Sequence, residues 1–127
     1  MIHLVTGGSG SGKSAYAEQC ILDFGGTRRV YIATMQPFGA EGQARIARHR
    51  KMRAAKKFST IECYTNLKEV ELEPGSDVLL ECMSNLTANE IFDPSGAGKA
   101  RTEEEILAGV SRLAHQARNL VLVTNEI

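Results

Sequence analysis

The stretch GGSGSGKS, residues 7–14, determines how the rest of the chain is interpreted. It fits the pattern G-x-x-x-x-G-K-S/T, in which glycines let the backbone wrap closely around a phosphate group. A short apolar run at 2–6 precedes it, and a segment with helical periodicity at 13–24 follows. In this order, a loop presents backbone N–H groups and the positive end of a helix dipole to an anion. The sequence therefore predicts a phosphate-binding loop.

The predicted loop contains a complete set of triphosphate-binding groups: Gly7, Gly8, Ser9, Gly10, Ser11, Gly12, Lys13 and Ser14. Lys13 is expected to reach the outer phosphates, and the Ser14 hydroxyl to ligate Mg²⁺. Enzymes with such a loop usually hold the metal with an acid at the end of a neighbouring strand. Glu81, which closes DVLLE, is the first candidate for this acid, ahead of Glu62 and then Glu126. Ser14 and Glu81 are thus the expected Mg²⁺ ligands.

Beyond the loop, strand-like and helix-like segments alternate. Strands are expected at 2–6, 28–34, 59–63, 77–83 and 119–127, and helices at 13–24, 41–57, 85–92 and 103–118. Thr102 is the expected N-cap of the last helix, and 93–100 is expected to be a mobile loop. The GAGK at 96–99 lacks the first glycine and the hydroxyl of the phosphate-loop pattern, so it is interpreted as part of this loop.

Alternating strands and helices predict an α/β fold, a mostly parallel sheet with helices on both faces. We expect a single nucleotide-binding domain of the P-loop NTPase-like class over residues 1–127. The chain stops immediately after a strand that a further helix would normally cover. The C-terminal part of the fold is therefore expected to be missing.

Composition limits the classes of function. Fifteen basic and fifteen acidic residues give a net charge of zero, which argues against general nucleic-acid affinity. The three cysteines lie far apart without metal-binding spacing, as reduced cytosolic thiols do. No apolar run approaches the roughly 20 residues of a membrane span, and no signal peptide is seen. These features predict a cytoplasmic protein without a membrane span.

A local basic run, ARIARHRKMR at 44–53, contains a histidine. In a helix, Arg45, His49 and Arg53 would share one face, because they are four residues apart. Guanidinium groups suit phosphate oxygens, and like charge lowers the pKa of an imidazole, which leaves it neutral and nucleophilic. Covalent catalysis at phosphorus is then chemically reasonable. Spacing alone, however, favours a solvated basic helix face with an incidental histidine. His3 and His115 lack such a setting and are interpreted as structural.

Six segments occur in one order: GGSGSGKS, YIAT (31–34), ARIARHRKMR, TIEC (60–63), LLEC (79–82) and VLVTNE (121–126). Together they resemble the bifunctional adenosylcobinamide kinase / adenosylcobinamide-phosphate guanylyltransferase family of cobalamin biosynthesis, over essentially the whole chain. The most specific element is the pattern R-I-x-x-H-x-x-x-R, which is met by Arg45, Ile46, His49 and Arg53. Members of that family continue well beyond VTNE, which is the main departure of this chain.

The resemblance implies two reactions. The first phosphorylates the aminopropanol hydroxyl of adenosylcobinamide from ATP or GTP, with Mg²⁺ as cofactor. The second transfers GMP from GTP to that phosphate through a phosphoramidate on the motif histidine, here His49. The family's nucleotide-lining positions fall, outside the loop, on Ile32, Ala33, Thr34, Arg50, Lys51, Met52, Arg53, Glu62 and Glu81. The resemblance also implies a homo-oligomer, commonly a trimer.

Two alternatives stay open at this point. The chain could be a different small-molecule P-loop kinase, in which residues 45–53 only clamp phosphates. It could also be a nucleotide-binding module without turnover, because the expected truncation removes part of the family's chain. A covalent GMP adduct distinguishes the first hypothesis from both alternatives.

Overall fold

A computed structural model of the protein describes residues 2–7, 12–36 and 39–125, with the backbone alone for His49 and Asn125. Four of the expected loop residues, Gly8, Ser9, Gly10 and Ser11, lie outside the described part. The third candidate acid, Glu126, lies outside it as well.

In the described part of the chain, five strands form one sheet in the order β1-β5-β4-β2-β3, and every neighbouring pair is parallel. The strands are β1 (Ile2–Gly7), β2 (Arg28–Ala33), β3 (Phe58–Glu62), β4 (Ser76–Glu81) and β5 (Asn119–Asn125). The helices are α1 (Lys13–Asp23), α2 (Gly39–Ala55), the short η1 (Leu67–Glu69), α3 (Met83–Phe92) and α4 (Thr102–Gln116). The predicted parallel α/β fold is confirmed, with element ends shifted by a few residues.

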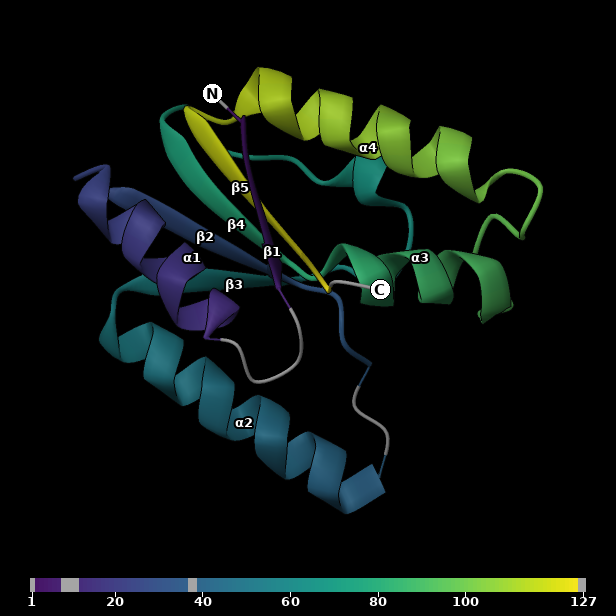
Figure 1. Cartoon of the computed structure of the whole chain (residues 1–127), viewed down its shortest axis with the longest axis horizontal. Helices are drawn as coiled ribbons and strands as arrows, with labels where there is room; N and C mark the ends of the chain where they lie inside the picture. The colour runs from purple at the N-terminus through teal and green to yellow at the C-terminus, as the bar shows by residue number, and fades with distance from the viewer. Residues whose placement is uncertain (1, 8–11, 37–38, 126–127) are drawn as a thin grey trace.

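Helices cover both faces of the sheet (Figure 1), with α1 and α2 on one side and α3 and α4 on the other. Consecutive residues of β4 pack into opposite cores: Val78 and Leu80 join the α3 and α4 side, and Leu79 joins the α1 side. A strand buried on both faces has no polar alternation, which is why DVLLE contains a continuous apolar run.

The predicted N-cap of the last helix is wrong. Thr102 lies inside α4, and Arg101 is the N-cap, without a side-chain cap hydrogen bond. The reason is the preceding turn: Gly98 has a φ of 81°, and its carbonyl accepts from both the backbone N–H and the hydroxyl of Thr102 at 3.1 and 2.7 Å. The hydroxyl therefore donates backward to a turn instead of accepting from the helix.

Residues 93–100 form turns, as the sequence predicts for GAGK and its surroundings. A buried carboxylate anchors this segment: Glu90, 2% exposed, accepts from the backbone N–H groups of Ala97 at 2.9 Å and Asn66 at 3.0 Å. The turn and the start of η1 are thereby held against the end of α3. Within the described residues, no helix is both long enough and apolar enough to cross a lipid bilayer.

Gly109 on α4 marks the closest approach of that helix to η1. A Cβ at this position would lie 2.7 Å from Leu67 Cβ and 3.0 Å from the Lys68 nitrogen. Gly109→Ala is therefore expected to lower the free energy of unfolding by about 1–3 kcal/mol, because overpacking outweighs alanine's helix preference. Urea denaturation measures the change. Ser111→Ala, at an exposed position of the same helix, is the control, expected within about 0.5 kcal/mol of the parent. A Gly109→Ala protein as stable as the parent would contradict this packing.

Candidate active site

The carboxyl ends of the parallel strands lie at one edge of the sheet, where ligands bind in open α/β folds. β1 ends at Gly7, which is in register with Asn125 of β5, and α1 starts again at Lys13. Gly12, the N-cap of α1, has a φ of 82°, a conformation that L side chains rarely adopt. The strand predicted before the loop and the helix predicted after it are therefore both present, on either side of the loop residues that the structure does not describe.

The two expected Mg²⁺ ligands meet at this edge. The Ser14 hydroxyl, in the first turn of α1, donates to Oε1 of Glu81, the last residue of β4. Hydroxyl and carboxylate oxygens are ligands that suit Mg²⁺, which needs only one or two protein groups when it also binds phosphates. The residues present thus fit the metal that the sequence predicts. Among the described residues, no three histidine, cysteine or acidic side chains form a separate metal cluster.

The other carboxylate oxygen of Glu81 is held from a neighbouring strand. Tyr31, on β2, donates its hydroxyl to Oε2 of Glu81 at 3.0 Å. The Tyr31 side chain is 7% exposed and belongs to the core on the α1 side. Sequence reasoning missed this residue, because only Ile32, Ala33 and Thr34 of the segment YIAT were assigned to the nucleotide site. The feature that could have identified Tyr31 is a hydroxyl-bearing side chain near the carboxyl end of a buried strand.

Arg53, near the end of α2, is a buried cation. Its guanidinium carbon lies 3.6 Å from the centroid of the Tyr31 ring, and the side chain is 5% exposed. Its Nε is buried without a hydrogen-bond partner among the described residues. Burying an uncompensated charge is costly, so such a group usually has a partner that completes it. The geometry suits an anionic ligand.

Two adjoining cavities lie at this place, of about 220 and 50 Å³. Both are lined by Tyr31, Arg53 and Glu81. The larger one adds Ser14 of the predicted phosphate loop, and the smaller one adds Arg45 of α2. Ser14, Glu81 and the basic helix α2 therefore border two neighbouring cavities that share three lining residues.

The predicted helix around His49 is confirmed, and it places the backbone of this residue between Arg45 and Arg53 on α2. The side chain of His49 lies outside the described part of the structure. Among the described side chains of α2, Arg53 alone is buried, so polar contacts rather than an apolar stripe hold this helix. One such contact is the ion pair of Arg50 with Glu62, and another, just past the helix, joins Lys56 to Glu18 at 2.8 Å.

The remaining predicted nucleotide-lining residues have different surroundings. Ala33 and Thr34 line the smaller cavity, and Met52 lines the larger one. Thr34 is fully buried, and its hydroxyl links the ends of β2 and β4 by accepting from the Cys82 N–H at 2.8 Å. The Ile32 side chain is instead fully buried in the core on the α3 and α4 side. Lys51 is exposed on α2.

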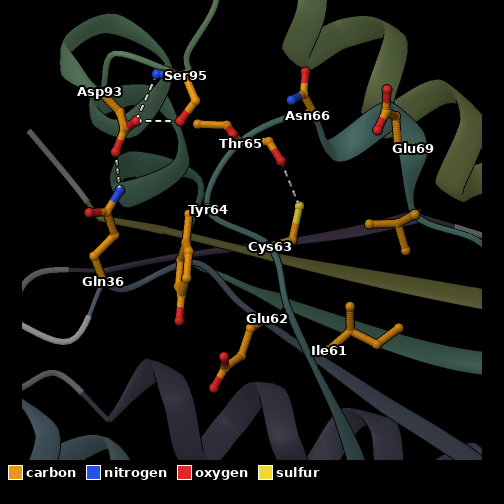
Figure 2. Close-up of a pocket in the computed structure, with 11 residues that line it drawn as sticks. Gln36, Ile61, Glu62, Cys63, Tyr64, Thr65, Asn66, Glu69, Asp93 and Ser95 are labelled. Atoms are coloured by element: carbon orange, nitrogen blue, oxygen red, sulfur yellow. Dashed lines mark hydrogen bonds between the residues drawn. The ribbon is translucent and has the colours of Figure 1, made fainter.

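A polar depression of about 510 Å³ lies beside the smaller cavity. Figure 2 shows the residues that line this depression. Glu62 and Tyr64 line both spaces. Within the depression Asp93 accepts from Gln36 Nε2 at 2.8 Å and from the backbone and hydroxyl of Ser95 at 2.9 and 2.6 Å. The hydrogen bonds from Ser95 and then from Gln36 lower the pKa of Asp93. This acidic depression was not predicted from the sequence, since its residues come from segments far apart along the chain.

Comparison with known proteins gives the family of this chain. The profile of the family described as "Cobinamide kinase / cobinamide phosphate guanyltransferase" matches residues 3–127. Two curated relatives, from Escherichia coli (strain K12) and Salmonella typhimurium (strain LT2), are both named "Bifunctional adenosylcobalamin biosynthesis protein CobU". Each is 35% identical over 140 residues, and the match covers 100% of this chain and 76% of the relative. With this similarity along its whole length, the chain belongs to the cobinamide kinase / cobinamide phosphate guanyltransferase family.

Proposed function

We propose that this protein phosphorylates adenosylcobinamide with ATP or GTP and then transfers GMP from GTP to the resulting phosphate, in cobalamin biosynthesis. Family membership supports the proposal. The observation that carries it is the meeting of three groups at one sheet edge. They are the phosphate-loop hydroxyl of Ser14, the strand-end carboxylate of Glu81 and the buried guanidinium of Arg53, which comes from the helix that bears His49.

For the kinase step, the loop residues 7–14 bind the triphosphate, and Lys13 neutralises its outer oxygens. Ser14 and Glu81 would hold Mg²⁺, which when bound neutralises the charge that develops on the transferred phosphoryl group. Arg53, which lines the same cavity as Ser14, supplies a guanidinium to the phosphates. The role of these residues is to position and neutralise, since phosphoryl transfer needs little other chemistry from the protein.

For the guanylyl step, a ring nitrogen of His49 attacks the α-phosphorus of GTP. A nitrogen–phosphorus bond forms, the bond from the α-phosphorus to the bridging oxygen breaks, and pyrophosphate leaves. An oxygen of the acceptor's phosphate then attacks the same phosphorus, and the imidazole is released. Arg45 and Arg53, four residues to either side on α2, would neutralise the α-phosphate oxygens.

The other predicted nucleotide contacts belong to the same proposal. Ala33, Thr34 and residues 50–53 line the nucleotide, and Glu62 contacts its guanine or ribose end. The acidic depression beside Glu62 and Tyr64 leaves room for a second substrate next to the nucleotide, which supports a transferase over a module that only binds. We also propose a cytoplasmic homo-oligomer, a trimer by family resemblance, whose mass light scattering measures.

The test is incubation of the protein with Mg²⁺ and GTP labelled at the α-phosphate. A covalent GMP adduct that is labile to acid and stable to base is expected, as for a phosphoramidate. Adding adenosylcobinamide phosphate should discharge it. Transfer of the γ-phosphate to a small acceptor without any adduct would instead indicate another P-loop kinase. GTP binding with neither product would indicate a nucleotide-binding module.

A further inference from the structure

We propose that Tyr31 is a positioning residue that joins the two halves of this site. Its hydroxyl orients the carboxylate of Glu81, and its ring orients the guanidinium of Arg53. The inference deepens the proposed function and rests on it for the identity of the ligands. It predicts that Tyr31 affects the affinity of the site for metal and for nucleotide.

The hydroxyl acts on the acidic half. Glu81 has two carboxylate oxygens, and Ser14 and Tyr31 donate to one each. A carboxylate held at both oxygens has one orientation, which is what a strand-end metal ligand requires. A phenol hydroxyl can donate and a carboxylate oxygen can only accept, so the hydrogen bond runs from Tyr31 to Glu81.

The ring acts on the basic half. Arg53 stacks at 3.6 Å over the centroid of Tyr31, a favourable arrangement of a cation on an aromatic face. No described residue hydrogen-bonds the buried Nε of Arg53. The ring is thus the contact that orients this guanidinium. Tyr31 and Arg53 line both cavities.

Tyr31 is itself held firmly. It lies within β2, which pairs with β3 on one side and β4 on the other, so that Tyr31 is opposite Thr60 and Leu79. Arg53 is less constrained, because it belongs to a helix whose described side chains are otherwise not buried. A rigid strand residue that contacts both partners can set their relative position.

Tyr31→Phe tests the hydroxyl, since it keeps the ring and the core volume. The probe is Mn²⁺, titrated by calorimetry into the protein saturated with GDP, with no turnover. We expect the metal affinity to fall about tenfold, the effect of one charge-assisted hydrogen bond, while GDP affinity measured in EDTA stays at the parent value. Tyr16→Phe, at an exposed position of α1, is the matched control and should match the parent. Parent-like metal affinity in Tyr31→Phe would overturn the role of the hydroxyl.

The ring is tested by a double-mutant cycle with Tyr31→Leu and Arg53→Ala. We expect Tyr31→Leu to weaken GDP binding in EDTA by about fivefold beyond Tyr31→Phe, because it removes the aromatic face. Arg53→Ala should then cost much less in the protein that already carries Tyr31→Leu than in the parent. An equal cost in both proteins would overturn the role of the ring. Circular dichroism melting checks that each variant is folded.

These readouts separate the inference from the proposed function. If the parent protein forms no GMP adduct and phosphorylates no acceptor, the proposed function fails. The metal and nucleotide affinities still decide whether Tyr31 positions Glu81 and Arg53. If instead the adduct forms and Tyr31→Phe binds Mn²⁺ as the parent does, the proposed function stands and the positioning role is rejected.

Discussion

His49→Ala is expected to abolish the covalent GMP adduct, with a loss of at least about a thousandfold in labelling rate, because the proposed nitrogen–phosphorus bond forms on this imidazole. GTP binding should be nearly unchanged, since the loop residues and Arg53 provide the phosphate contacts. Gel-based detection of protein-bound label from α-labelled GTP measures the adduct, and calorimetry measures binding. This result would show that the basic face of α2 carries the nucleophile.

A matched control separates the nucleophile from histidines in general. His115→Ala alters an exposed imidazole in the last turn of α4, whose Nδ1 lies 2.7 Å from the Ser111 carbonyl. It should label as the parent does. The mechanism is rejected if His49→Ala and the parent carry the same amount of label. Kinase activity that persists in His49→Ala, with labelling lost, would show that the two steps use different groups.

Lys13→Ala is expected to weaken GTP and ATP binding by at least about a hundredfold, with the fold intact. The lysine is the first residue of α1, directly after the loop, and its ammonium is the cation that the pattern assigns to the outer phosphates. Losing charged hydrogen bonds to a triphosphate costs a few kcal/mol, which corresponds to this factor. Isothermal calorimetry gives the affinity, and circular dichroism melting without nucleotide checks the fold.

The control for this prediction lies in the same chain. Lys99 belongs to GAGK, which resembles the end of the phosphate-loop pattern, but it is exposed in a turn between α3 and α4. Lys99→Ala should bind nucleotide with the parent's affinity. Normal GTP affinity in Lys13→Ala would show that the phosphate site has been placed at the wrong segment. A shared loss in both variants would point to a general charge effect instead.

The strand-end residues illustrate how far the sequence could reach. Ile32, Ala33 and Thr34 were predicted together as a lining segment, but successive side chains of a strand point to opposite faces. Ile32 therefore packs in the core with α3 and α4, whereas Tyr31 and Ala33 face the cavities. The alternation of side chains along a strand can be predicted from the sequence. The sequence does not show which face of the sheet the predicted phosphate loop and α2 would cover.

Arg53 shows the same limit on a helix. Spacing placed Arg45, His49 and Arg53 on one face, and the helix is confirmed. Spacing did not predict that Arg53 would be buried on the ring of Tyr31, or that Arg50 would pair with Glu62. Contacts between residues this far apart in the chain depend on how α2 packs against the sheet. No local pattern encodes that packing.

The sequence by itself determined the parallel α/β fold, and it predicted a phosphate loop between the first strand and the first helix, with Ser14 and Glu81 as Mg²⁺ ligands. It could do so because apolar periodicity and glycine positions act locally, and because parallel strands must end at a common edge. Only the tertiary structure showed that Tyr31 contacts both Glu81 and Arg53, and that the buried Arg53 lines the same cavity as Ser14. The physical reason is that these contacts join β2, β4 and α2, whose relative placement is set by packing of the whole domain.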